Sequence, residues 1–472
     1  MANRTASLND RKVQMTVNLT AKARGWLIGS VLLFSFVAAF FAWSEPYAAP
    51  VLLAAAVFTF FVIRNSEIGL FGFVIVFLMI PLPSSFGSLQ SLTAGILVLI
   101  LLIGIWIFKM VAIQRRIEIQ ATRLVRSMFV FAAVSGLAYL AGFLPWLPIE
   151  AAPADVQLGA LGIFILSMAI ALLVGHQIDR ESSLKRLVAL FLIIGSIFMV
   201  GTVISPIAGI ADRLLLPHAR GSMFFTWLLA LAFGQVMLNT DLDRRLRAGL
   251  MIVGLLSSYL LFILKLDWVS GWLPALTAVA TIIWIAQPRW RILYLMAGAI
   301  VTFLIFQSTL GQSLIYQNEY SLLTRSAAYD IMFEIIKVNP ILGLGPANYY
   351  HYTPLFPILG WYVSFNSHNQ YVDIIAQIGL LGLGVFIWFC VEHVITNWRL
   401  QKQAHSPFVR AYLLSCLGGM AGMLVSGFLG DWFFPFVYNI GVNGTAGSFV
   451  AWVFLGGVIA IERIGAQEKN PF

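Results

Sequence analysis

The sequence predicts an all-α, polytopic membrane protein that folds as one helical bundle. Of its 472 residues, 60% are hydrophobic and only 10% are charged, whereas soluble domains carry about 25% charged residues. Apolar runs long enough to cross a bilayer, about 20 residues, recur from one end of the chain to the other. Basic residues gather in alternate connections between these runs, as positive-inside topology requires.

Fourteen apolar runs are expected to be transmembrane helices. The first has no small-residue cleavage signature and is therefore interpreted as an uncleaved span. The third and the tenth are short. Their limits are 26–43, 48–63, 68–82, 89–113, 127–147, 157–175, 186–206, 222–239, 248–264, 272–287, 291–309, 371–395, 409–429 and 445–462.

The basic residues predict the orientation. With the N-terminus in the cytoplasm, 24 of the 29 Lys and Arg residues lie on the cytoplasmic side, and every cytoplasmic connection holds at least one. The net charge of +9 then reflects membrane topology and not nucleic-acid binding. The predicted order is a cytoplasmic tail (1–25), eleven spans (26–309), an extracytoplasmic loop (310–370), three spans (371–462) and a second cytoplasmic tail (463–472).

Five basic residues fall on the extracytoplasmic side. Basic residues are disfavoured there, so each is expected to pair with an acidic residue or to have a functional role. Lys337 has Glu334 three residues before it on an expected helix. The other four are Arg213, Arg220, Lys265 and Arg325, of which Arg213 follows Asp212 and Lys265 lies near Asp267.

The long extracytoplasmic loop is expected to be functional, because unstructured loops of this length are uncommon in compact folds. Residues 321–338 have the apolar face of a surface helix, which Asn339-Pro340 ends. The loop then continues through Gly343 and Gly345, which permit a tight turn or close approach of the backbone to a ligand.

The start of the twelfth span combines a histidine with a polar stripe. His368 precedes the span, and Asn369, Asp373 and Gln377 recur every four residues on one helical face. Such a stripe is expected to face the bundle interior or a wet cavity. An ordinary helix cap and a helix-packing seam would produce the same pattern.

These extracytoplasmic side chains suit the handling of a phosphorylated, lipid-linked substrate. Arginine binds phosphate through two parallel hydrogen bonds, and a histidine can take a proton from a hydroxyl. The sequence contains no phosphate-binding loop, dinucleotide fingerprint, HExxH or acidic cluster, and Cys390 and Cys416 have no metal-ligand spacing. No metal and no cofactor are therefore expected.

The region 320–390 resembles the signature region of the O-antigen ligase/polymerase superfamily. The features occur in order and with suitable spacing: Arg325, a helix, Pro340, Ile-Leu-Gly-Leu-Gly at 341–345, Ser367-His368-Asn369, and Ile-Gly-Leu-Leu-Gly at 378–382. Elsewhere the resemblance rests on span count and topology.

The resemblance implies an integral-membrane glycosyltransferase, similar to the C-type, in the inner (plasma) membrane of a bacterium. Its donor would be a glycan on undecaprenyl diphosphate, and its acceptor a hydroxyl of a glycolipid or glycan on the extracytoplasmic face. Arg220 and Arg325 would bind the diphosphate, and His368 would act as base or contact the diphosphate. Asn369 and Asp373 would orient it, and transfer would invert the anomeric configuration without a metal.

The remaining substrate-binding expectations are Lys265, Arg213, Gly343 and Gly345. Ligases of this superfamily commonly carry Ser-Arg-Gly at the outer end of a middle span, where this chain reads Trp-Val-Ser-Gly-Trp at 268–272. Lys265 would supply the missing charge as a point charge. Ligase and polymerase both remain open.

Two other functions compete with glycan transfer. A transporter or flippase for a lipid-linked or small solute would bury ionisable residues near the middle of its spans. The sequence places its ionisable residues at the span ends, which disfavours transport. A structural subunit of a membrane complex is the third hypothesis.

Overall fold

The described part of the chain is all-α apart from one two-stranded sheet. A computed structural model describes residues 14–18, 58–59, 61–62, 64–81, 93–204, 206, 208–307 and 309–469. The longer helices are α3 (Ser66–Met79), α4 (Ala94–Phe108), α5 (Arg123–Ala141), α6 (Ala154–Gln177), α7 (Glu181–Val203), α9 (Ser222–Leu238), α10 (Arg244–Tyr259), α11 (Val269–Ala286), α12 (Arg291–Gln307), α13 (Thr309–Ile336), α15 (Gln370–Gln403), α16 (Pro407–Gly427) and α17 (Thr445–Lys469).

Short elements join these helices. They are strands β1 (Gln14–Asn18) and β2 (Arg116–Gln120), α8 (Ala208–Leu214), α14 (Tyr349–Tyr352), the π-helical turns η1 (Lys109–Ile113) and η4 (Leu260–Leu264), and the 3-10 turns η3 (Pro217–Arg220), η5 (Pro288–Trp290), η6 (Thr353–Leu355) and η7 (Val442–Gly444).

The membrane-spanning character of the bundle is confirmed. Within the described part of the chain, nine helices are long and apolar enough to cross a bilayer, and α3 and α9 are shorter apolar helices. A helix lies at every expected span from the third onward. The first span (26–43) and most of the second (48–63) lie outside the described residues, so the total of fourteen stays a prediction.

Helix starts follow ordinary capping chemistry. Thr93 accepts a hydrogen bond from the backbone N–H of Ile96 (3.1 Å) at the start of α4. Thr122 does the same for Val125 (3.2 Å) at the start of α5. These side chains satisfy backbone donors that the first helical turn leaves free, so each helix begins where its polar flank meets its apolar run.

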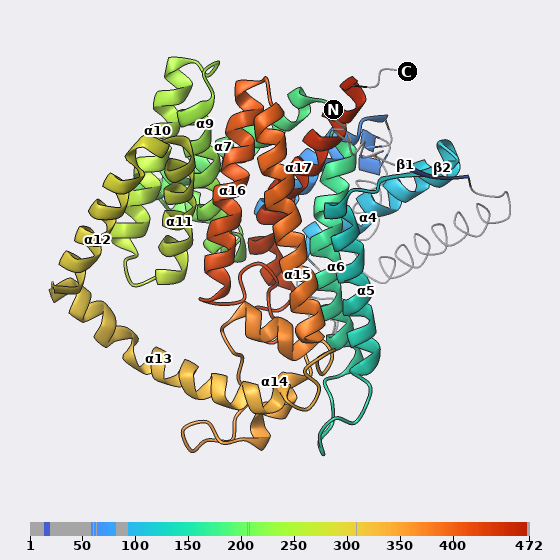
Figure 1. Ribbon diagram of the computed structural model, residues 1–472, viewed down its shortest axis with the longest axis vertical. Coiled ribbons are helices and arrows are strands. Elements are labelled where there is room, and N and C mark those ends of the chain that lie inside the picture. Colours follow the sequence, from blue (N-terminus) through green and yellow to red (C-terminus); the bar gives the residue numbers. More distant parts are fainter. Residues whose placement is uncertain are drawn as a thin grey trace, which may run out of the picture.

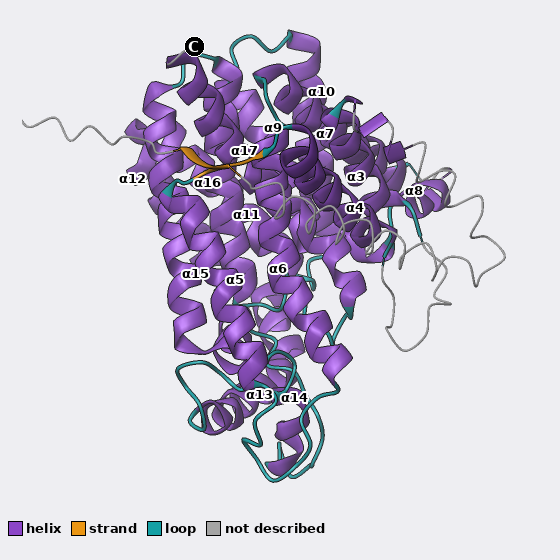
Figure 2. Ribbon diagram, turned by 90° about the vertical axis from the view of Figure 1, so that its right-hand side faces the viewer, coloured by secondary structure: helices purple, strands orange, loops and turns teal. Residues whose placement is uncertain are grey.

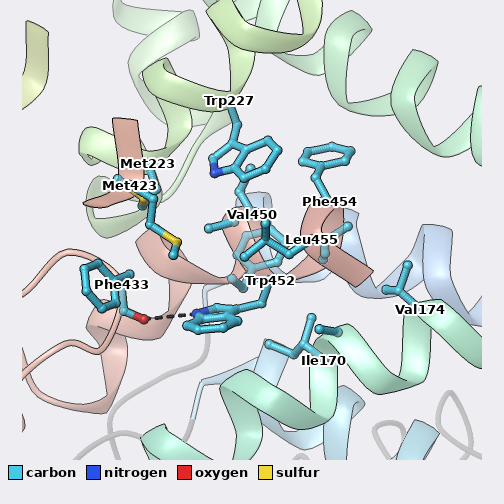
Figure 3. Close-up of a cluster of buried hydrophobic side chains, with 14 of the residues drawn as sticks. Ile170, Val174, Met223, Trp227, Met423, Phe433, Val450, Trp452, Phe454 and Leu455 are labelled. Atoms are coloured by element: carbon cyan, nitrogen blue, oxygen red, sulfur yellow. Dashed lines mark hydrogen bonds between the residues drawn. The ribbon is translucent and has the colours of Figure 1, made fainter. Parts of the chain in front are cut away.

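The innermost helix is α17, which packs along α6, α9 and α16. Its Trp452 is fully buried (0% exposed), between Ile170 of α6 and Met223 and Trp227 of α9 (Figure 3). The Trp452 indole N–H donates to the carbonyl of Phe433 (3.0 Å). This contact ties the bundle centre to the loop between α16 and α17, which forms part of the site.

The small sheet was not predicted. β1 pairs antiparallel with β2, with Thr16 opposite Glu118. Residues 116–120 read Arg-Ile-Glu-Ile-Gln, and this polar/apolar alternation is typical of a strand. Residues 14–18 of the expected N-terminal tail therefore form a strand, and the rest of that tail lies outside the described residues.

The segment expected as a long loop is mostly helix. α13 begins at Thr309, twelve residues before the expected surface helix, and ends at Ile336. α12 and α13 form a bow on the outside of the bundle that leads from α11 to α14 (Figure 1). Figures 1 and 2 both place α13 and α14 at one end of the bundle, with the turns of the 341–369 segment beside them.

One expectation about buried charge was wrong. Glu392 and His393 lie within α15, 8% and 1% exposed respectively. The indole N–H of Trp388 donates to Glu392 Oε1 (3.1 Å). The expected span ended at 395, which placed both residues near its end, whereas α15 continues to Gln403.

Candidate functional site

The site is built around a break in α15. Gly379 has φ 74° and ψ 178° inside the helix, a conformation that is essentially restricted to glycine. The backbone of the 340–345 segment fills the break. The N–H groups of Leu344 and Gly345 donate to the carbonyls of Ala376 (2.9 Å) and Gln377 (3.1 Å), and those of Leu380 and Leu381 donate to Pro340 (2.8 Å) and Ile341 (3.1 Å).

This pairing explains why the two glycine-rich motifs occur together. A Cβ on Gly379 would lie 1.9 Å from the carbonyl oxygen of Ile341, and a Cβ on Gly343 would lie 2.6 Å from the backbone of Gln377. Gly345 has φ 94°, and its Cβ would lie 2.3 Å from Cα of Gly142. Gly343 and Gly345 thus permit close approach of backbone to backbone, and their contact with substrate stays a prediction.

Asn348 fixes the same segment to the loop after α5. Its side-chain amide donates to the carbonyls of Gly142 (2.9 Å) and Leu344 (2.8 Å). Its Oδ1 accepts from the N–H of Ala152 (2.9 Å). The residue is fully buried, so it satisfies three backbone groups that would otherwise be costly to bury.

The polar stripe of α15 is largely structural. Asn369 is the N-cap, and its Oδ1 accepts from the N–H of Tyr371 (3.0 Å). Asp373 is 0% exposed and accepts from the hydroxyls of Tyr349 (2.6 Å) and Ser367 (2.7 Å) through Oδ1. Gln377 Oε1 accepts from the N–H of Ala347 (3.0 Å). The packing-seam interpretation accounts for these contacts, and substrate binding by Asn369 and Asp373 stays a prediction.

His368 lies immediately before the cap, in a left-handed conformation with φ 49°. Hydrogen bonds on either side hold this turn, because the His368 N–H donates to Asn366 Oδ1 and the Asn369 N–H donates to Ser367 Oγ (3.0 Å). The imidazole remains exposed while its neighbours Ser367 and Asn369 are buried. A left-handed non-glycine residue costs free energy, and here it directs a reactive side chain away from the cap.

Arg325 and Asp431 both act electrostatically on His368. Burial lowers the pKa of His368, the charge of Asp431 opposes this shift, and the charge of Arg325 adds to it. Arg325 is partly buried and makes no ion pair or hydrogen bond with another described residue. The fold thus brings together two of the three residues expected to be catalytic, since such effects require the charges to lie near the imidazole.

Asp431 is a site residue that was not predicted from the sequence. It is 4% exposed, and burial raises the pKa of its carboxyl group. The N–H of Phe436 donates to Oδ2 (2.7 Å) and the amide of Asn439 donates to Oδ1 (2.9 Å). Its position in an aromatic run, Gly-Asp-Trp-Phe-Phe at 430–434, was the available signal, because an isolated acid there needs partners.

Arg220 and Lys265 are linked to Trp432, the neighbour of Asp431, through contacts of the residues beside them. Arg220 pairs with Asp212 (Nη1 to Oδ1, 2.7 Å), and the next residue, Gly221, packs against the Trp432 ring. Lys265 is exposed, and its Nζ lies 5.8 Å from the ring centroid of Trp268.

Arg213 is exposed on α8, and its side chain makes no ion pair or hydrogen bond with another described residue. Lys337 pairs with Glu334 (2.5 Å), as its spacing predicted. In the described part of the chain, no three His, Cys, Asp or Glu residues group closely enough to hold a metal ion.

Comparison with known proteins supports the resemblance found in the sequence. Residues 268–387 match the family described as O-Antigen ligase. This range includes the start of α11, Arg325, the two paired glycine motifs and His368. No curated protein matches the chain. The match covers residues 268–387 alone, and over that region the chain is similar to the O-antigen ligase family.

Proposed function

We propose that this protein transfers a glycan from an undecaprenyl-diphosphate-linked donor to a hydroxyl group on the extracytoplasmic face of the bacterial inner membrane. The family match supports glycosyl transfer of the ligase or polymerase type. The observation that carries the proposal further is the position of His368, which is exposed in a constrained turn under the influence of Arg325 and Asp431.

His368 is the general base in this proposal. A lowered pKa keeps its imidazole neutral at neutral pH, so that it can accept a proton from the acceptor hydroxyl. The protonated imidazole is then stabilised by the nearby carboxylate of Asp431. Asn366 and Ser367 hold the backbone of His368, so the ring is positioned before substrate binds.

The bond changes are those of an inverting substitution. The acceptor oxygen attacks the anomeric carbon and forms the new glycosidic bond while its proton passes to His368. The bond from that carbon to the diphosphate oxygen breaks, and its electron pair leaves with the diphosphate. Arg325 and Arg220 would offset the added negative charge. For Arg220, the diphosphate must compete with Asp212.

The arrangement of the bundle supports an extracytoplasmic site. β2 and the C-terminal ends of α15 and α17 lie at one end of the bundle, and α13 and α14 lie at the other (Figure 1). The first end carries the connections rich in Lys and Arg. The positive-inside rule makes that end cytoplasmic, so both termini would face the cytoplasm and His368 the opposite side.

Transport is the alternative that the buried Glu392 and His393 would favour. A broken helix such as α15 is also common in transporters. In this chain, however, backbone of the 340–345 segment fills the break and occupies the carbonyls of Ala376 and Gln377, which a broken helix would otherwise offer to a solute. Glycan transfer is therefore the better-supported function.

The test is a transfer assay with purified protein in proteoliposomes. Donor is supplied as undecaprenyl-diphosphate-linked glycan together with a glycolipid acceptor. The proposal expects glycan on the acceptor, or a lengthened lipid-linked glycan in the polymerase case, with release of undecaprenyl diphosphate and no loss of activity in chelator. Movement of intact donor between leaflets without any new glycosidic bond would contradict it and support transport.

A further inference from the structure

Two tryptophans from distant parts of the chain form a corner beside the site. Trp268 precedes α11 and Trp432 lies in the loop between α16 and α17. Their ring centroids are 6.1 Å apart with an interplanar angle of 66°. Both side chains are only partly buried, so the corner presents indole surface to a ligand. We call Trp268 and Trp432 the tryptophan corner.

Glycine backbone supports each ring of the tryptophan corner. A Cβ on Gly271 would lie 2.1 Å from Cε3 of Trp268, and a Cβ on Gly221 would lie 3.2 Å from Cζ3 of Trp432. Trp268 also packs edge-on against Phe225, with ring centroids 5.8 Å apart. Both indoles are therefore held in place, and Gly271 is required for the position of Trp268.

The indole N–H groups of the corner lack acceptors. Trp272 and Trp452 donate to the backbone carbonyls of Leu266 (2.9 Å) and Phe433 (3.0 Å). By contrast, Trp268 and Trp432 donate to no other described residue, and Nε1 of Trp432 is buried. Indole nitrogen is a donor only. A ligand with oxygen atoms would therefore satisfy the N–H of Trp268, which is not among the buried unpaired atoms, whereas a hydrocarbon chain would not.

The corner connects Arg220 and Lys265, two of the residues proposed for the diphosphate, to Asp431 beside the proposed base His368. Lys265 lies beside the Trp268 ring, and Arg220 precedes the glycine beneath Trp432. Trp432 also directly follows Asp431, whose charge acts on His368. The reacting sugar must lie between the diphosphate that leaves and the base that takes the proton.

We propose that the tryptophan corner binds the sugar attached directly to the diphosphate. A pyranose ring has apolar C–H faces, which pack on an indole face, and hydroxyl groups, which accept from an indole N–H. This inference rests on the proposed function and adds the residues that recognise the first sugar. Trp268 and Trp432 distinguish a glycan donor from the bare lipid diphosphate, and Lys265 and Arg220 recognise what both ligands share.

The experiment compares two ligands on purified protein in nanodiscs: the undecaprenyl-diphosphate-linked glycan and glycan-free undecaprenyl diphosphate. Trp268→Ala should weaken binding of the glycan donor by about tenfold, the effect of one well-packed aromatic contact, and leave the glycan-free ligand unchanged. Gly271→Ala, which displaces the Trp268 ring, should do the same. Lys265→Ala should weaken both ligands.

Two further variants keep the comparison interpretable. Trp284→Ala alters an exposed tryptophan at the other end of α11 and should change neither affinity. Trp268→Phe keeps a ring on Gly271 and should weaken donor binding by a smaller factor, which covers the case in which alanine unfolds the corner. Unchanged binding of the glycan-free ligand reports that the fold is intact.

Several results would overturn the inference. If Trp268→Phe weakens binding of both ligands equally, the Trp268 ring contacts the lipid or the diphosphate, or only stabilises the fold. Unchanged donor binding in both Trp268 variants would remove the corner from recognition. If the wild-type protein binds neither ligand, the proposed function itself fails. If the wild-type protein binds both ligands but the Trp268 variants do not selectively weaken binding of the glycan donor, only this inference is overturned.

Discussion

At the scale of single residues, the proposed chemistry depends on the charges around the imidazole of His368. Asp431 is buried and opposes the lowering of the His368 pKa, whereas Arg325 and burial promote it. The neutral base is lost as pH falls through the pKa of His368, so the acidic limb of kcat/KM should report that group.

Asp431→Asn should move this limb to lower pH. The substitution removes the charge that raises the pKa of His368, while an amide oxygen can still accept from the N–H of Phe436. The measurement is kcat/KM for glycan transfer across pH 4–8, a range of about two units on each side of the ordinary histidine pKa. A limb that stays in place, or moves to higher pH, would separate Asp431 from His368.

Arg220→Lys tests whether this side chain grips the diphosphate as a fork. Lysine retains the charge that pairs with Asp212 but cannot form two parallel hydrogen bonds. We expect kcat/KM to fall by about tenfold or more, with little change in the melting temperature. Near-normal turnover would leave Arg220 with a purely structural role in the pair with Asp212.

At the scale of elements, the break in α15 is the feature most sensitive to substitution. Gly379→Ala would place a Cβ 1.9 Å from the Ile341 carbonyl oxygen in a conformation with φ 74°. We expect destabilisation of at least about 2 kcal/mol, measured as a lower melting temperature in detergent.

Gly384→Ala is the matched control, because Gly384 lies in the same helix with no atom within 4 Å of an added Cβ. It should be neutral or stabilising by up to about 1 kcal/mol. If both variants melt like the wild type, the 340–345 segment does not depend on the break.

The helices could be predicted where a local sequence pattern, such as an apolar run or an apolar face, determines them. Apolar runs located the described helices from α3 onward, and the C-terminal half of α13 followed from its apolar face. The strand β1 was not predictable because its partner lies about a hundred residues away. The glycine motifs at 341–345 and 378–382 were visible, but only the fold shows that they contact each other.

Individual site residues could be predicted from the sequence, but their contacts with one another could not. Arg325 and His368 could be selected because cations are scarce on that side and because the residues resemble a known signature. Asp431 and the pairing of Trp268 with Trp432 depend on the loop after α16 folding back onto the start of α15 and α11, which no local pattern encodes. Arg220 was selected for its charge, but its pairing with Asp212 emerged only from the structure.

At the scale of the whole molecule, the account predicts which end of the bundle faces the cytoplasm. Both native cysteines are buried, so an impermeant maleimide should report only an introduced one. Trp361→Cys, at a position 72% exposed, should be labelled in intact spheroplasts. Asp241→Cys, at the opposite end, should be labelled only after the membrane is permeabilised. The reverse pattern would invert the topology and place His368 in the cytoplasm.

The proposed function requires the bundle to hold the neutral imidazole of His368 next to an acceptor hydroxyl. The most direct measurement is the rate of glycan transfer by His368→Ala in proteoliposomes, compared with His405→Ala, an exposed histidine after α15. We predict a loss of at least about 100-fold for His368→Ala, the usual contribution of a general base, and a wild-type rate for His405→Ala, with both proteins folded. Transfer by His368→Ala at a rate near that of the wild type would show that His368 is not the general base.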